Sequence, residues 1–419
     1  MSSCCSNFTS FQLPDNVRNL LRKYIWIKQK VLKFKNAEYL ILINRCNKRR
    51  YFVQAVEEDI YYVELRRLNT RNNRGILVTS RTFILENPRL VAEQICDLLI
   101  QDSNQLVTKP YPPGFMPQST CTVDVEVGQG VFPWPDKVFA PYIGTTCWPY
   151  YELDANAEET GVLYYVLGFV VAASSIDCTA TWATFFDICN VPQLLGIEKL
   201  REMGGDVSAS FGGQANTPIW TCAADAETLA DCYKEIIDLY DFRRIDFDIE
   251  GAWVDDTTGN VRNSLALRIL QDDLLSEPVE IWLTLPVATT GLTSAGLEVV
   301  QLMIDAGVDI TGVNAMTMDY VPVETDMAQA SIDALNALQE QLSGLYPDKS
   351  EEEIWQMIGA TPLIGDNDIA GETFTQDDAQ TLFDFAQSVN MRLLSMWSSN
   401  RDLSLFDNEY SAIFNEFTT

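Results

Sequence analysis

The stretch RRIDFDIEG, residues 243–251, constrains the fold of this chain more than any other part of it. Side chains of a β-strand alternate between two faces, so Asp246, Asp248 and Glu250 point one way and the apolar residues between them point the other way. Strands covered on both faces are typical of parallel sheets in α/β proteins. Three adjacent buried carboxylates are costly unless they share protons and accept hydrogen bonds. The pattern therefore predicts an acid/base site rather than an acidic cluster kept for packing.

The chain contains no histidine, which limits its chemistry. Ser-His-Asp and Cys-His nucleophile schemes and histidine-ligated zinc are excluded, so catalysis near neutral pH would rely on carboxylates, tyrosine, cysteine or lysine. The ten cysteines show no CxxC or zinc-like spacing, and without histidine a catalytic cysteine is not expected. Cys178 and Cys222 each follow a predicted strand and are able to pair, whereas Cys232 lies on the apolar face of a predicted helix and is expected to be a buried thiol.

The net charge changes sign along the chain. Residues 1–110 carry a net charge of +8, and the remaining residues carry −38. This contrast predicts two units made for different surroundings. We assign residues 1–105 to a small basic α+β domain, residues 106–134 to a proline-rich linker, and residues 135–419 to an acidic domain that should repel nucleic acid and anionic membranes.

Within the basic domain, helices are predicted at residues 17–32 and 88–101, with four short strands between them in one mixed sheet. Basic side chains gather in the turns: Arg45, Lys48, Arg49, Arg50, Arg66, Arg67, Arg71 and Arg74. They predict either docking onto an acidic partner, such as a protein scaffold bound through residues 1–110, or only a solvated basic surface. No nucleic-acid-binding motif is present, so no nucleic acid partner is expected.

The first residues lack the basic and then apolar pattern of a secretory signal, and no run of 18 apolar residues occurs. Neither a signal peptide nor a membrane span is therefore expected. A substrate outside the cell would be reached on a particle or by another export route, and a cytoplasmic location is the alternative.

From residue 135 onward, apolar strand-like runs alternate with helical patterns. The strand candidates are residues 137–143, 163–172, 206–212, 243–250, 279–287, 310–318, 354–364 and 391–397. Eight strand–helix units predict a (β/α)8 TIM barrel, an α/β fold. Polar and aromatic residues gather at the strand ends, where the active face of such a barrel lies: Tyr142, Ser210, Gly212, Gly213, Glu250, Asp319, Asp366, Asn367 and Trp397.

Several blocks in this order resemble glycoside hydrolase family 18, the chitinase family. SFGG at residues 210–213 is similar to the family's SxGG, and IDFDIEG at residues 245–251 to its DxxDxDxE. FAPYI, CTATW, AMTMDY, ATPLIGDND and LSMWSSNRD resemble blocks of a bacterial chitinase subgroup. The resemblance covers about residues 135–402. It implies a glycosidase that needs no metal and no organic cofactor.

Two positions depart from the family pattern. Arg243 replaces the first Asp of DxxDxDxE, at a position expected deep in the strand. Met318 takes the usual tyrosine position of the sixth-strand motif. Tyr320 lies two residues farther on, and strand alternation is expected to turn it to the same side as Met318.

The resemblance implies a substrate-assisted mechanism, in which the 2-acetamido group of the substrate is the nucleophile. Glu250 would be the general acid and then the base, and Asp248 would orient the acetamido group. Asp246 would share a proton with Asp248 and accept hydrogen bonds from Ser210 and Tyr142. Asp319 would help to hold the sugar.

Aromatic residues in the barrel loops are candidates to line sugar subsites. Trp397 resembles the family's tryptophan beneath the distorted sugar, while Trp148, Trp182 and Trp253 either line further subsites or pack in the core. The remaining substrate-binding candidates implied by the resemblance are Tyr142, Ser210, Gly212, Gly213, Met316, Met318 and Asn367.

Three interpretations of function follow. The first is a chitinase-like glycosidase acting on β-1,4-linked N-acetylglucosamine polymers, with the basic domain docking it onto a phage tail, a virion or an injection particle. The second is a non-catalytic chitin- or glycan-binding barrel. The third is an endo-β-N-acetylglucosaminidase that cleaves N-glycans. The presence of Asp246, Asp248 and Glu250 favours an enzyme over a binding module.

Overall fold

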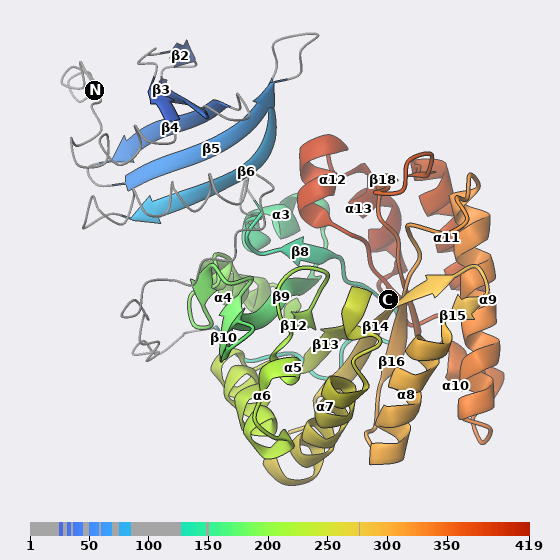
Figure 1. The fold of residues 1–419 in the computed structure, drawn as a ribbon. Helices are drawn as coiled ribbons and strands as arrows, with labels where there is room; N and C mark the ends of the chain where they lie inside the picture. Colours follow the sequence, from blue (N-terminus) through green and yellow to red (C-terminus); the bar gives the residue numbers. More distant parts are fainter. Residues whose placement is uncertain are drawn as a thin grey trace. The chain divides into compact units, whose positions relative to one another are not determined.

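The computed structural model describes residues 127–147, 151–275 and 277–419, together with the backbone of six strands between residues 25 and 84. The chain divides into two compact units (Figure 1). One comprises residues 1–118 and 147–149, and the other comprises residues 119–146 and 150–419.

The N-terminal unit contains an antiparallel sheet with the order β1-β3-β4-β5-β6, in which β2 also pairs with β3. Its strands are β1 (Ile25–Ile27), β2 (Leu32–Phe34), β3 (Ala37–Asn44), β4 (Arg50–Glu57), β5 (Ile60–Leu68) and β6 (Gly75–Ile84). The mixed sheet expected from the sequence is therefore wrong, because short connections join neighbouring strands into hairpins.

The helix predicted at residues 17–32 is wrong where the structure describes that stretch. The β-branched and aromatic run Ile25–Ile27 forms β1 instead and pairs with Leu42, Ile43 and Asn44 of β3. The helix predicted at residues 88–101 and the basic side chains of the turns lie outside the described residues.

The second unit is the predicted (β/α)8 barrel. Its parallel strands follow the order β9-β12-β13-β14-β16-β17-β20-β7, and β8 pairs with β9. Because only Ala140 and Pro141 separate β7 from β8, this one segment closes the sheet on itself. The strands are β7 (Val138–Phe139), β8 (Tyr142–Gly144), β9 (Tyr164–Ser174), β12 (Asp206–Gly212), β13 (Arg244–Asp248), β14 (Glu280–Ala288), β16 (Gly312–Met316), β17 (Ile358–Thr361) and β20 (Leu393–Leu394).

Helices surround the barrel and cover the outer face of its strands (Figure 1). They are α3 (Leu153–Thr160), α4 (Leu194–Glu202), α5 (Ile219–Cys222), α6 (Ala226–Tyr240), α7 (Thr257–Ile269), α8 (Ser294–Ala306), α9 (Met327–Leu345), α10 (Glu351–Trp355), α11 (Gln376–Ser388), α12 (Ser399–Leu405) and α13 (Glu409–Phe414). Side chains that accept a backbone N–H fix several helix starts, as Asp225 does for α6 and Thr375 for α11. None of the described helices has the length and apolarity that crossing a bilayer requires.

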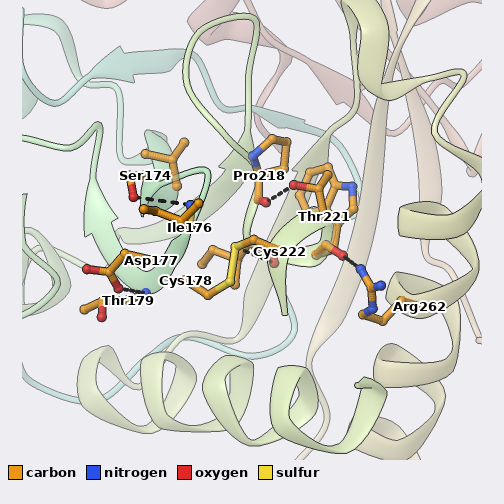
Figure 2. Close-up of a disulfide and its surroundings, with 12 residues drawn as sticks. Ser174, Ile176, Asp177, Cys178, Thr179, Pro218, Thr221, Cys222 and Arg262 are labelled. Carbon is orange, nitrogen blue, oxygen red and sulfur yellow. Dashed lines mark hydrogen bonds between the residues drawn. A yellow bond between two sulfur atoms is a disulfide. The ribbon is translucent and has the colours of Figure 1, made fainter. Parts of the chain in front are cut away.

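Short elements extend the barrel loops. They are the strands β10 (Asp177–Trp182), β11 (Phe186–Asp187), β15 (Gly291–Leu292), β18 (Gly365–Asp366) and β19 (Thr373–Phe374), and the short helices η1 (Gly251–Trp253), η2 (Leu270–Leu274) and η3 (Asn415–Phe417). A disulfide between Cys178 and Cys222 joins β10 to α5, as the sequence allowed (Figure 2). Cys232 is a free thiol packed partly against the core, and burial raises its pKa to about 11.

The last residues of the predicted linker belong to the barrel unit. Trp134 is 1% exposed and packs inside the barrel with Val138, Tyr164 and Trp282. Its indole N–H and the backbone N–H of Val131 both donate to Asp206 Oδ2, at 3.0 and 2.9 Å. The barrel unit therefore begins before residue 135, because this segment fills the amino-terminal end of the barrel.

Candidate active site

Strand β13 builds the centre of the site by alternation. Arg244, Asp246 and Asp248 face the barrel interior and are at most 4% exposed. Phe247 faces outward and packs against Tyr233 of α6, with ring centroids 5.3 Å apart. Glu250 follows the end of the strand and is half-buried. The three carboxylates therefore lie in one column that runs from the middle of the barrel to its carboxyl-terminal end.

Arg243 does not lie deep in the strand, as the sequence pattern suggested. Strand β13 begins one residue later, and the Arg243 guanidinium pairs with Asp241 at 2.9 Å outside the barrel interior. The buried cation of the strand is Arg244, whose Nε donates to Glu280 Oε2 at 2.7 Å.

Three hydroxyl groups hold the Asp246 carboxylate. Tyr142 and Ser210 donate to its Oδ2 at 2.8 and 2.6 Å, which are the two contacts expected from the sequence. Thr284 of β14 donates to Oδ1 at 2.6 Å. Burial raises the pKa of Asp246, while the three hydroxyl groups and the Arg244 charge oppose that rise.

The carboxyl groups of Asp248 and Glu250 are close enough for each to shift the pKa of the other. Burial, and then the charges of Glu250 and Asp246, raise the pKa of Asp248 well above its usual value. Burial also raises the pKa of Glu250 to about 7, and the nearby Asp319 charge adds to this rise. Asp248 is thus influenced by both Glu250 and Asp246, and the sharing of a proton between Asp246 and Asp248 that the resemblance implies stays a prediction.

Gly212 and Gly213 allow the close backbone approach beside these carboxylates. A Cβ on Gly212 would lie 2.2 Å from the Asp248 carbonyl oxygen, and one on Gly213 would lie 2.9 Å from the Phe169 ring. Both residues have positive φ, at 105° and 85°, which disfavours other residue types. The backbone N–H of the next residue, Gln214, lowers the pKa of Glu250. The two glycines therefore bring the loop after β12 against the site.

Asp319 lies in the loop after β16 and is held by the loop after β17. Its backbone N–H donates to Asn367 Oδ1 at 3.2 Å, and its Oδ1 accepts the N–H of Ile369 at 3.0 Å. Asn367 Nδ2 donates to the Leu363 carbonyl oxygen at 2.8 Å. Both polar atoms of the Asn367 side chain therefore hydrogen-bond to the protein. Its link to the site is the contact with Asp319.

Tyr320 does not turn to the same side as Met318. It is 2% exposed within the main core, and its ring lies against α9 with the hydroxyl beside Ser331. Strand alternation fails here because β16 ends at Met316 and Asp319 adopts a positive φ of 51°. Met316 and Met318 are both half-buried near the carboxyl-terminal end of the barrel.

The aromatic residues predicted to line sugar subsites differ in burial and in their neighbours. The rings of Trp397 and Phe169 stack at 5.4 Å with an interplanar angle of 19°, and Tyr142 lies 6.0 Å from Trp397. Trp182 is not a subsite residue, because it is fully buried and its indole donates to the Ile188 carbonyl oxygen at 2.9 Å. Trp253 is half-buried in η1, three residues after Glu250. Trp148 lies outside the described residues.

The sequence patterns missed Thr284 and Phe169. Thr284 is a hydroxyl residue two positions after Trp282 on the inward face of its strand, so alternation could have identified it. Phe169 lies in a continuously apolar strand that carries no such signal. Among the described residues, no group of three or more Cys, Asp or Glu side chains could hold a metal ion.

Comparisons with known proteins show which family has this fold and site. No family model matches the chain. The crystal structure of the catalytic domain of a hyperthermophilic chitinase from Pyrococcus furiosus is 33% identical, with a TM-score of 0.62. The match covers 68% of this chain and 96% of that domain. The chain belongs to glycoside hydrolase family 18, the chitinase family.

Two curated relatives of this family-18 chain are each 38% identical over 281 residues, or 64% of the chain. One is a probable bifunctional chitinase/lysozyme of Escherichia coli, and the other is endochitinase 11 of Metarhizium anisopliae. The matched regions span 31% and 53% of the length of these two relatives.

Proposed function

We propose that this family-18 chain hydrolyses β-1,4-linked N-acetylglucosamine polymers by substrate-assisted, retaining catalysis. The observation that carries the proposal is the carboxyl pair of Asp248 and Glu250, with the pKa of Glu250 raised to about 7. A carboxyl group that keeps its proton near neutral pH can act as a general acid. The relatives of this chain include the chitinase catalytic domain of Pyrococcus furiosus, which supports chitin as the substrate class.

In the proposed first step, Glu250 gives its proton to the glycosidic oxygen while the acetamido carbonyl oxygen of the substrate attacks the anomeric carbon. The bond to the leaving sugar breaks, and an oxazolinium ion forms on the substrate itself. Asp248 accepts the acetamido N–H and stabilises the positive charge that develops. The ionised Glu250 then takes a proton from water as its oxygen attacks the anomeric carbon and the bond to the acetamido oxygen breaks. Each of the two steps inverts that carbon, so the product keeps the β configuration.

Asp319 and Trp397 complete the proposed site. The Asp319 carboxylate is close enough to Glu250 to influence its pKa, and we assign it to hold the acetamido group or the sugar hydroxyls. Trp397 and its stacked partner Phe169 supply an aromatic surface for the C–H face of a sugar ring.

The test is hydrolysis of a fluorogenic chitooligosaccharide by the wild type and by Glu250→Gln. Loss of the general acid should lower kcat by about two to four powers of ten. The control is Glu159→Gln, an exposed glutamate on α3, which should retain the wild-type rate. The first product should be the β-anomer by NMR.

Two outcomes would contradict the proposal. Absence of wild-type hydrolysis, combined with binding to chitin, would favour a glycan-binding barrel. Release of glycans from a glycoprotein without cleavage of chitin oligomers would favour an endo-β-N-acetylglucosaminidase.

We also propose that the N-terminal unit docks the enzyme onto an acidic scaffold of a larger particle, such as a phage tail, a virion or an injection particle. The support is the contrast between a net charge of +8 in residues 1–110 and −38 in the remainder. The full chain should co-sediment with the producing organism's particle fraction, and a chain starting at residue 119 should not. Equal co-sedimentation of both chains would contradict the docking role.

A further inference from the structure

A hydrogen-bonded chain of polar side chains crosses the barrel interior below the carboxyl pair. It begins at Asp246 Oδ1, which accepts the Thr284 hydroxyl at 2.6 Å. Asn314 of β16 donates through Nδ2 to Thr284 Oγ1 at 3.0 Å and to Thr361 Oγ1 of β17 at 2.7 Å. Thr284, Asn314 and Thr361 are each at most 2% exposed. The neighbouring strands β14, β16 and β17 thus contribute one polar side chain each to a network that connects to the Asp246 carboxylate.

The direction of these hydrogen bonds follows from the chemistry of the groups. The amide nitrogen of Asn314 only donates, so Thr284 Oγ1 accepts from it. The single hydroxyl hydrogen of Thr284 has two neighbouring oxygens, Asp246 Oδ1 at 2.6 Å and the Tyr142 hydroxyl at 2.8 Å. An ionised carboxylate only accepts, whereas the Tyr142 hydroxyl has its own hydrogen, so the Thr284 hydrogen is assigned to Asp246. With Tyr142 and Ser210 donating to Oδ2, both oxygens of Asp246 accept hydrogen bonds.

The barrel is shaped to hold Asn314 in place. A Cβ on Gly359 of β17 would come within 2.9 Å of Asn314 Oδ1, so the absence of a side chain there leaves room for the amide. The Thr361 hydroxyl also lies 3.0 Å from Asn314 Oδ1. The Thr361 hydroxyl therefore contacts both the oxygen and the nitrogen of the amide, and the nitrogen also donates to Thr284.

We infer that Thr284, Asn314 and Thr361 are positioning residues that hold Asp246 as an ionised acceptor and so leave the mobile proton to Asp248 and Glu250. This inference rests on the proposed function. The charged or titratable described groups that face Asp246 are Arg244 and Asp248 on its own strand and Tyr142 from β8. Strands β12 and β14 contribute only the uncharged hydroxyl groups of Ser210 and Thr284.

The test compares two identical substitutions. Thr284→Val removes the donor to Asp246 and keeps the shape of the side chain. Thr317→Val is the matched control, because Thr317 is also buried and its hydroxyl has no hydrogen-bond partner among the described residues. Thr284→Val should lower kcat on a chitooligosaccharide by about ten- to a hundredfold, the usual effect of losing a hydrogen bond to a charged group. KM should change by less than about threefold in both variants.

The pH profile of kcat/KM separates positioning from simple destabilisation. Without its donor, ionised Asp246 is less stable, so the acid limb of the profile should move to higher pH in Thr284→Val. Thr284→Ser, which restores the hydroxyl, should restore the wild-type limb. In Asn314→Leu the Thr284 hydroxyl loses its constraint, and a smaller shift in the same direction is expected.

Two results would overturn the inference. One is an unchanged acid limb in Thr284→Val together with a fall in rate no larger than that of Thr317→Val. The other is a Thr284→Ser variant that behaves like Thr284→Val. Failure of the proposed function itself would appear separately, as absence of hydrolysis by the wild type or an unaffected Glu250→Gln.

Discussion

The two ends of the barrel interior both bury charged groups, but they arrange them in opposite ways. At the amino-terminal end, Glu280 lies between Arg244, at 2.6 Å, and Arg392. At the carboxyl-terminal end, Asp246, Asp248 and Glu250 gather like charges: hydroxyl groups donate to Asp246, and the pKa values of Asp248 and Glu250 are raised. Burial is similar at both ends, so the arrangement of charge decides the role. Paired opposite charges hold the barrel together, whereas crowded like charges keep a proton available for chemistry.

The largest expected effect falls on activity at the carboxyl-terminal end. Asp248→Asn removes the partner of Glu250 and the acceptor for the acetamido N–H, so kcat on a chitooligosaccharide should fall by about two to four powers of ten. The midpoint of chemical unfolding should not fall, because a crowded carboxyl group has been removed. A variant that loses stability together with activity would show that Asp248 is mainly structural.

Removing a buried charge at the amino-terminal end of the barrel should instead lower the stability of the fold. Glu280→Gln leaves Arg244 and Arg392 without their counter-charge, which should lower the free energy of unfolding by about 3–5 kcal/mol. Denaturant titration measures this loss. The control is Lys199→Met, which breaks an exposed pair with Asp154 and should leave the unfolding midpoint unchanged. Equal denaturant midpoints for Glu280→Gln and the wild type would show that the paired charges at the amino-terminal end of the barrel do not stabilise the fold.

The buried Glu250 at the carboxyl-terminal end of the barrel should also destabilise the fold as pH rises. The pKa of Glu250 is about 7 in the folded chain, against an ordinary value of 4.5. The unfolded chain therefore releases this proton first, and wild-type stability is lost as pH rises from 4.5 through 7. Glu250→Gln should then exceed the wild type by up to about 3 kcal/mol at pH 8 and by little at pH 4.5.

Denaturant titrations at the two pH values measure this gain, with Glu159→Gln as the control that should show none. A Glu250→Gln variant no more stable than the wild type at the higher pH would mean that the carboxyl pair is not under electrostatic stress.

The smallest expected effect concerns Asp319. Its charge contributes to the raised pKa of Glu250, so Asp319→Asn should move the basic limb of the kcat/KM profile to lower pH. Asp368→Asn changes an exposed carboxylate between Asn367 and Ile369, the two residues that hydrogen-bond with Asp319, and should leave that limb in place. An unmoved limb in Asp319→Asn would limit the role of Asp319 to contacts with the sugar.

Much of this site could be predicted from alternation along single strands. The period of two placed Asp246 and Asp248 on one buried face, and the strand ends brought Tyr142 and Ser210 to Asp246. Alternation failed where a strand stops, as at Tyr320, which follows Asp319 in its left-handed conformation.

Contacts between strands were harder to predict. The Thr284 hydroxyl that donates to Asp246 comes from a different strand, so the pattern along β13 alone could not reveal it. The sequence left Trp182 open between a subsite and the core, because it does not show whether a residue at a strand end turns toward the core, where the structure places this one. The start of β13 decided between Arg243 and Arg244 as the buried cation, and strand boundaries are uncertain in any sequence pattern.

The pH dependence of wild-type kcat/KM on a fluorogenic chitooligosaccharide tests the central claim most directly. If Glu250 is the general acid, with its pKa raised by burial and by the Asp319 charge, the rate should fall as pH rises through about 7. A rate that stays constant or increases from pH 6 to pH 9 would contradict the assignment of Glu250 as the proton donor.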